Sequence, residues 1–125
     1  HSASSAASDV YKRQAINVLF SDKMRLPTLI FDEIDSGTSG KVANVIGDLM
    51  KKIGFESQII AISHLAQVAA KASNHFKVYK ILSSNKPKTL LRKLNHEERI
   101  EEIAAMISAD NITNPALDQA IELLK

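Results

Sequence analysis

Two adjacent carboxylates follow a short apolar run near the start of the chain. Residues 28–31 read TLIF, and Asp32 and Glu33 come directly after them. A short run that is apolar on both faces is typical of a buried parallel strand, and α/β sheets bind ligands at the carboxyl ends of such strands. A carboxylate there can hold a hydrated Mg²⁺, and an adjacent one can accept a proton from an attacking water. On the dipeptide alone, an acidic strand end that caps the next turn is the competing interpretation.

A second apolar run ends in a histidine. Residues 58–62 read QIIAI, and Ser63 and His64 follow. If the two runs are adjacent parallel strands, Asp32, Glu33 and His64 reach the same edge of the sheet. A histidine at that edge can donate a hydrogen bond to a terminal phosphate and orient a water molecule. A lone histidine is more often structural, but its position at an equivalent strand end favours a functional role here.

The elements that must position these residues alternate between strands and helices. Besides the two strands, we expect an amphipathic helix capped by Ser39 or a neighbour and ended by Gly54 as its C′ residue, and a final helix begun by Pro115. The expected ranges are 15–22 (the end of a helix), 28–31 (strand), 41–53 (helix), 58–62 (strand), 65–72 (helix), 75–82 and 88–94 (hairpin), 97–107 (helix) and 115–124 (helix). This order predicts an α/β architecture with parallel strands at its centre and no internal linker.

Composition excludes several classes of protein. The chain has 125 residues, of which 45% are hydrophobic and 24% charged, and these are ordinary globular values. It has no cysteine, which excludes disulfide scaffolds, thiolate zinc sites and cysteine nucleophiles. No apolar run approaches the roughly 20 residues of a transmembrane helix, so we expect no membrane partner. The net charge of +2 is too close to balance to indicate a nucleic-acid partner by itself.

The first fourteen residues differ from the rest. Residues 4–14, SSAASDVYKRQ, are the translation of a DNA string that resembles a transposase adapter used for sequencing libraries. We therefore interpret residues 1–14 as a non-native or disordered tail, and residues 15–125 as the natural part. A natural disordered N-terminus is the alternative interpretation.

Three separated segments of the natural part resemble the C-terminal part of the ATPase head of the RecN family, DNA-repair ATPases related to SMC proteins and ABC ATPases. Residues 26–40, LPTLIFDEIDSGTSG, resemble the family's Walker B strand and D-loop. Residues 59–80 resemble its switch-histidine segment and the next strand, and residues 99–124 are similar to its C-terminal helices. The resemblance implies that residues 15–125 form part of a P-loop NTPase head of the ABC/SMC type.

The resemblance also implies residue roles. Asp32 would support Mg²⁺, directly or through water, and Glu33 would be the catalytic base or position the water. His64 would be the switch histidine near the γ-phosphate. Asp35 and Ser36 would belong to the D-loop, which crosses to the partner head in an ATP-sandwiched dimer.

A few positions depart from the family pattern. Gln67, one helical turn beyond His64, is part of the family-like segment, and it is given only a packing role or a role in supporting the residues that contact the nucleotide. Ser63 and Ala66 stand where the family often has Thr and Pro. Ala109 stands where glycine is common, which predicts a differently shaped helix end.

The implied activity is ATP hydrolysis with ATP and Mg²⁺, coupled to head-to-head homodimerisation in DNA double-strand break repair and recombination, in the bacterial cytoplasm at the nucleoid. The chain has no G-x-x-x-x-G-K-[ST] phosphate loop, no signature motif and no coiled-coil heptads, so an N-terminal lobe and a coiled coil would be missing from it. We therefore expect the isolated chain to bind ATP weakly or not at all and to hydrolyse none. A sheet without its other lobe also predicts aggregation.

Two other functions compete with this one. Residues 32–35, DEID, also resemble the DExD motif of helicases, but those enzymes usually follow with a Ser-Ala-Thr-like strand end, and this chain has Ser63-His64. The other is a non-enzymatic DNA-binding or oligomerisation module built on the basic hairpin. A solvated strand face explains that hairpin better at this level, because no aromatic residues are interleaved for base stacking. Its basic residues are Lys77, Lys80, Lys86, Lys88, Arg92 and Lys93.

Overall fold

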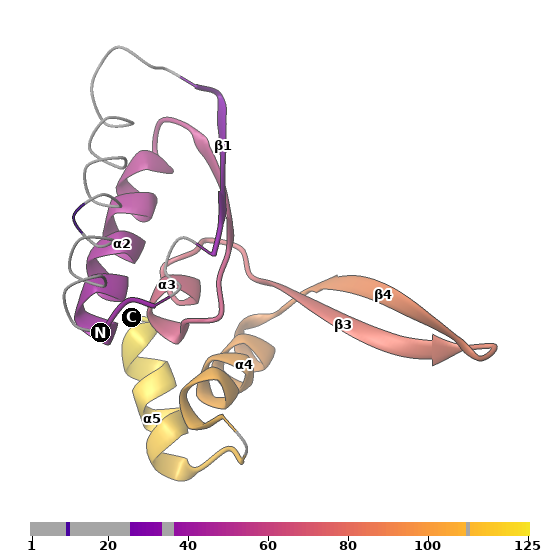
Figure 1. The fold of residues 1–125 in the computed structure, drawn as a ribbon. Coiled ribbons are helices and arrows are strands. Elements are labelled where there is room, and N and C mark those ends of the chain that lie inside the picture. The colour runs from indigo at the N-terminus through magenta and orange to yellow at the C-terminus, as the bar shows by residue number, and fades with distance from the viewer. Residues whose placement is uncertain (1–9, 11–25, 34–36, 110) are drawn as a thin grey trace. The chain divides into compact units, whose positions relative to one another are not determined.

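The computed structural model describes Val10 and residues 26–33, 37–109 and 111–125, which form parts of two compact units, residues 1–71 and 72–125. The adapter-like segment, apart from Val10, and the expected helix over 15–22 lie outside the described residues. Figure 1 shows the order of the elements. The first unit contains β1 (Thr28–Asp32), α2 (Gly40–Ile53), β2 (Gln58–Ile62) and α3 (Ala66–Ala69), and the second contains β3 (Phe76–Ser83), β4 (Lys86–Lys93), α4 (His96–Ser108) and α5 (Asn114–Leu123).

The strands β1 and β2 pair in parallel, as the sequence predicts. Their register runs from Thr28 opposite Gln58 to Asp32 opposite Ile62. One face of this sheet packs against α2 and α3, and the core that results contains Phe31, Ala43, Ile46, Met50 and Val68. Ile46 is only 1% exposed, and burying a side chain of this size contributes about 2–3 kcal/mol. The expected α/β class with parallel strands is therefore confirmed.

The other face of the β1–β2 sheet is exposed, which corrects the expectation of strands buried on both faces. Ile30 is 68% exposed, and Ile60 and Ile62, which share its face, are 44% and 54% exposed. The apolar runs are those of a two-sided buried sheet, but α2 and α3 cover only the side of Leu29, Phe31 and Ile59. An apolar run of this kind is typical of a sheet covered on both faces, and the described residues cover only one face.

The helices α2 and α3 approach closely at Gly47. A Cβ atom at this position would lie 2.9 Å from Cγ of Lys71 and 3.1 Å from the carbonyl oxygen of Gln67. The helix α3 is shorter than the expected range 65–72, because the Lys71 N–H donates to the Val68 carbonyl in an i→i+3 bond that tightens the last turn.

The predicted ends of α2 are partly correct. Ser39 is the N-cap residue, and its carbonyl accepts from the Ala43 N–H at 2.9 Å, but its side chain makes no capping hydrogen bond. Gly54 ends the helix, as the sequence predicts, but as the C-cap residue in the right-handed region with φ −60° and not as the C′ residue.

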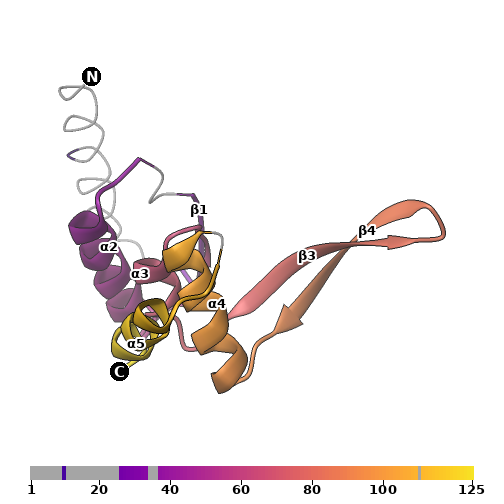
Figure 2. The same ribbon diagram turned by 90° about the horizontal axis from the view of Figure 1, so that it is seen from below.

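In the second unit, β3 and β4 form an antiparallel hairpin with a tighter turn than expected. The loop is only Ser84–Asn85, with φ 51° and 59°, and two positive φ values define a type I′ turn. The strands therefore extend to Ser83 and Lys86, and Pro87 lies within β4 opposite Leu82. Figures 1 and 2 both show the hairpin tip extending well past α4 of the same unit.

The helices α4 and α5 pack together and have well-formed N-termini. The Asn95 side chain accepts from the Glu98 N–H, and the Glu98 carboxylate accepts from the Asn95 N–H, both at 2.9 Å, which is a capping box. Pro115 opens α5 after the N-cap Thr113, as the sequence predicts. The small buried residues Ala104, Ala116 and Ala120 and the buried Ile103 allow close packing of this unit.

The end of α4 has a positive φ at its C-cap, in the region that favours glycine. Ala109 occupies its C-cap with φ 65°, and its N–H donates to the Ala105 carbonyl at 3.0 Å. A positive φ costs an alanine about 1 kcal/mol more than a glycine, so glycine would fit this position better. Among the described residues, no helix is long and apolar enough to cross a membrane.

Candidate functional site

The parallel register brings the sequence-predicted residues to one edge of the β1–β2 sheet. Asp32 pairs with Ile62, and the Glu33 N–H donates to the Ile62 carbonyl at 2.9 Å. The ladder thus continues one residue past Asp32, and His64 follows Ile62 by two positions. Asp32, Glu33 and His64 are all exposed. Asp35 and Ser36 lie outside the described residues.

The backbone of Glu33 adopts an unusual conformation. Its φ is 47°, which places a non-glycine residue in the left-handed region at a cost of about 1–2 kcal/mol. The hydrogen bond to Ile62 holds this conformation, because it fixes the Glu33 N–H on the end of β2. Residues held in sparsely populated backbone regions cluster at functional sites, so the strain at Glu33 supports a role for this edge.

The turn that carries His64 is also fixed. The Ser63 hydroxyl accepts from the Leu65 N–H at 3.0 Å, which closes a tight turn around His64. A threonine at position 63 would provide the same hydroxyl acceptor.

Gln67 lies beside the start of α2. A Cβ atom added at Gly40 would lie 3.5 Å from the Gln67 amide nitrogen. The Gln67 side chain therefore lies close to the backbone at the N-terminus of α2.

The strand-end carboxylates suit a hydrated cation. Within the described ranges, no three His, Cys, Asp or Glu side chains gather into a group that could hold a metal by themselves. Mg²⁺ characteristically takes one or two protein carboxylates and completes its shell with water and phosphate oxygens. The exposed carboxylate of Asp32 fits that kind of site.

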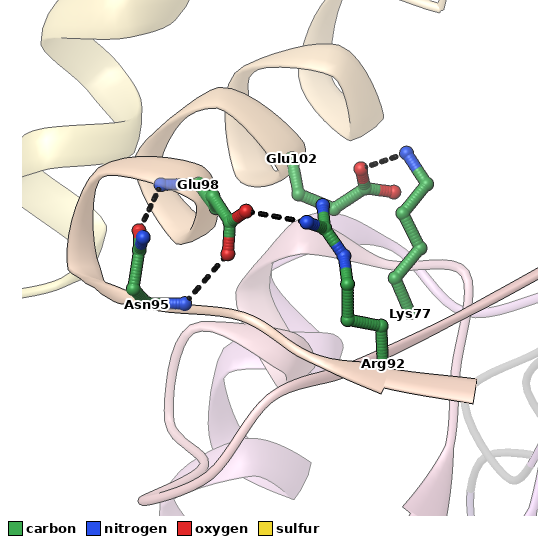
Figure 3. Close-up of polar contacts among 5 residues, drawn as sticks. All are labelled: Lys77, Arg92, Asn95, Glu98 and Glu102. Carbon is green, nitrogen blue, oxygen red and sulfur yellow. Dashed lines mark hydrogen bonds and ion pairs between the residues drawn. The ribbon is translucent and has the colours of Figure 1, made fainter.

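Sequence analysis missed a second cluster of polar groups at the base of the hairpin, shown in Figure 3. Lys77 and Arg92 are directly opposite in the hairpin register, and each forms an ion pair with a glutamate of α4. Arg92 Nη1 lies 2.7 Å from Glu98 Oε1, and Lys77 pairs with Glu102. The signal was available in the sequence, since Glu98 and Glu102 are four residues apart on a helix that begins with an Asn-x-x-Glu capping box.

These ion pairs border a depression with a volume of about 250 Å³. Its walls come from the second unit alone, so it contains none of the strand-end residues. The residues that line the depression are Lys77, Arg92, Glu98, Glu101, Glu102, Ala105 and Ile112.

His75, just before β3, has a perturbed pKa. Burial lowers the pKa of His75, the nearby Arg99 and Lys77 charges lower it further, and Glu102 partly opposes them. Its Nδ1 atom is buried and has no hydrogen-bond partner among the described residues. The Arg99 guanidinium donates to the Ala72 carbonyl, and burial lowers the pKa of Arg99 as well.

Comparison with known proteins gives a consistent set of relatives. No protein-family model matches the chain. The chain is 44% identical to the DNA repair protein RecN of Rickettsia conorii and 41% identical to that of Haemophilus influenzae, in each case over 110 residues, or 88% of this chain. It is 38% identical over 111 residues to RecN of Bacillus subtilis. The sequence is thus similar to RecN proteins. It corresponds to the C-terminal part of RecN and spans about one fifth of the length of these relatives, 20%, 20% and 19%.

Solved structures agree with the fold. A chain from a structural study of ATP-driven dimerization and DNA-stimulated activation of SMC ATPases superposes with a TM-score of 0.53 at 21% identity, covering 72% of this chain and 56% of that chain. The Smc head domain with a coiled coil and joint from Pyrococcus yayanosii gives a TM-score of 0.52 at 24% identity, covering 68% of this chain and 15% of that one. This chain therefore shares its fold with these SMC ATPase heads.

Proposed function

We propose that this chain is the part of a RecN ATPase head that carries the hydrolytic edge of the nucleotide site. The observation that carries the proposal is the β1–β2 register, in which the Glu33 N–H is bonded to Ile62 two residues before His64. A parallel sheet with a carboxylate pair and a histidine on neighbouring strand ends has the parts needed to orient a water beside a phosphate.

Each residue has a distinct role in this proposal. Glu33 accepts the proton of the attacking water or fixes its position. His64 donates a hydrogen bond to the terminal phosphate. Asp32 holds the Mg²⁺ that accompanies ATP, directly or through water, and that ion neutralises phosphate charge when bound.

The partners follow from the same proposal. Asp35 and Ser36 form the D-loop that meets a second head, so hydrolysis is coupled to a head-to-head homodimer acting on DNA in the bacterial cytoplasm, at the nucleoid. The SMC structure study named above concerns ATP-driven dimerization and DNA-stimulated activation, and this supports the coupling. The phosphate loop, the signature motif and the coiled coil would come from other parts of a RecN protein. The sequence similarity to RecN proteins supports this assignment, and it gives no support to the helicase alternative.

The experiment places the natural part of this chain in a complete protein. Residues 15–125 replace the corresponding segment of Haemophilus influenzae RecN, and ATP turnover of the purified chimera is measured with and without Glu33→Gln. We expect Glu33→Gln to reduce turnover by about 10²–10⁴-fold, the usual contribution of a general base, while ATP binding is retained. The 125-residue chain alone is expected to hydrolyse no ATP.

The matched control is Glu56→Gln, which makes the same change at an exposed glutamate in the turn between α2 and β2. It is expected to leave turnover unchanged. Equal turnover of the Glu33→Gln and Glu56→Gln chimeras would refute the assignment of Glu33.

A further inference from the structure

Charge is strongly segregated within the second unit. The hairpin over residues 76–93 contains six basic residues and no acidic one. The neighbouring helix α4 carries the opposite charge, with Glu97, Glu98, Glu101 and Glu102. The hairpin is therefore strongly cationic, although the net charge of the whole chain is only +2.

Two of the three basic residues at the base of the hairpin are already ion-paired. Lys77 and Arg92 pair with Glu102 and Glu98 of α4, as Figure 3 shows. A polyanion approaching the base would also meet the acidic helix α4. The base of the hairpin is therefore a poor site for an anionic ligand.

The outer half of the hairpin keeps its charge. Lys80, Lys86 and Lys88 are exposed, and no ion pair joins them to any carboxylate in the described parts of the chain. Lys86 follows the turn directly and pairs with Ser83. Lys88 comes two residues after Lys86, and Lys80 comes three residues before Ser83. The end of β3 adds Ser83, and the turn adds Ser84 and Asn85, whose polar side chains can bind phosphate oxygens.

The lysines also lie on both faces of the ribbon. Lys88 lies opposite Ile81, so Lys86 and Lys88 share the face of Ile81. Lys80, opposite Thr89, is on the other face. A two-stranded β-ribbon fits the major groove of DNA, which is roughly 12 Å wide and lined by phosphates on both sides. Long lysine side chains on both faces of the hairpin tip can reach phosphates on either side of that groove.

We propose that the hairpin tip, with Lys80, Lys86 and Lys88, binds the phosphates of double-stranded DNA. This site deepens the proposed function, on which the choice of DNA as the polyanion rests. The contact is to the backbone and independent of sequence, because the tip provides charge and hydroxyl groups but no aromatic residue for stacking.

The test measures the salt dependence of DNA binding by the chimera described above. Fluorescence anisotropy follows its binding to a labelled duplex of arbitrary sequence, without nucleotide, between about 50 and 200 mM salt. Each phosphate contact contributes about 0.9 to the slope of log K against log salt concentration, so the variant with Lys80→Gln, Lys86→Gln and Lys88→Gln is expected to lower the slope by about 3. The affinity should fall by a similar factor for unrelated duplex sequences.

The control removes the same charge elsewhere. Lys51→Gln, Lys52→Gln and Lys125→Gln together change the end of α2 and the last residue, and are expected to leave the slope unchanged. Equal effects of the two triple variants would overturn the proposal, since net charge alone would then explain the binding.

An unchanged slope in the hairpin variant would overturn it too. The exposed apolar side chains of Val78, Leu82 and Leu91 would then mark this hairpin as a protein-binding surface instead. The two failures are distinguishable, because a chimera whose turnover depends on Glu33 keeps the proposed ATPase function even if its hairpin binds no DNA.

Discussion

At the scale of single residues, Glu33 combines an exposed carboxylate with a backbone that glutamate rarely adopts. Its φ of 47° and its hydrogen bond to Ile62 belong together, since the bond ties the residue after β1 to the end of β2. The carboxylate pair and the histidine were predictable from the sequence, because apolar runs followed by polar residues mark strand ends. The backbone conformation was not, because it depends on pairing with a strand distant in the sequence.

His75 gives a pH-dependent stability. Its lowered pKa means that the folded state binds a proton less readily than the unfolded chain, whose histidine pKa is near 6.5. The stabilising contribution is therefore complete above about pH 6.5 and is lost as the pH falls towards the folded pKa. Between the folded and the unfolded pKa of His75, the unfolded chain binds a proton at this histidine and the folded chain does not.

Urea denaturation at neutral and at mildly acidic pH measures this effect. We expect His75→Gln to reduce the loss of unfolding free energy on acidification. His96→Gln is the matched replacement of an exposed histidine on α4. An equal change in pH dependence for both variants would show that His75 is not the responsible group.

At the scale of elements, the close approach of α2 and α3 depends on Gly47. We expect Gly47→Ala to lower the free energy of unfolding by about 1 kcal/mol, because the strain of overpacking exceeds the roughly 1 kcal/mol gained in helix propensity. The new Cβ would press on the Gln67 carbonyl and on Lys71, which is held by an ion pair with Asp48 at 2.8 Å. Chemical denaturation of the parent and the variant gives the difference.

Gly40→Ala is the control for this substitution. Its Cβ would meet only the Gln67 amide nitrogen at an ordinary contact distance of 3.5 Å, so a change within about 0.5 kcal/mol is expected. A more stable Gly47→Ala variant would mean that helix propensity outweighs the contact and that α3 does not pack closely there.

Most element types were predictable from periodicity, and the differences have local causes. The hairpin turn was expected over five residues because of Pro87, but Ser84 and Asn85 accept positive φ and close the turn in two. The end of α3 depends on an i→i+3 bond, and the pattern of alanines carries no signal for it.

At the scale of the whole molecule, one face of the β1–β2 sheet presents apolar surface that the described residues leave uncovered. Ile30, Ile60 and Ile62 form an exposed face of the β1–β2 sheet. We expect the 125-residue chain to self-associate with increasing concentration, because strand edges and apolar faces of this kind pair with other copies. Sedimentation velocity over a tenfold concentration range measures the association.

The double variant Ile30→Thr and Ile60→Thr is expected to weaken this association, since threonine keeps the β-branched shape and adds a hydroxyl. Val45→Thr makes the same kind of change on the exposed side of α2, where Val45 is 47% exposed, and should have little effect. A parent chain that stays monomeric throughout would contradict the interpretation of this face.

The central claim is that the ends of β1 and β2 form one hydrolytic site. The most direct measurement is ATP turnover of the RecN chimera in a double-mutant cycle of Glu33→Gln and His64→Gln. Residues that act on the same reacting phosphate give strongly non-additive losses, so the double variant is predicted to lose about as much turnover as the more damaging single variant. Losses that multiply in the double variant would show that Glu33 and His64 act independently, and would contradict the claim.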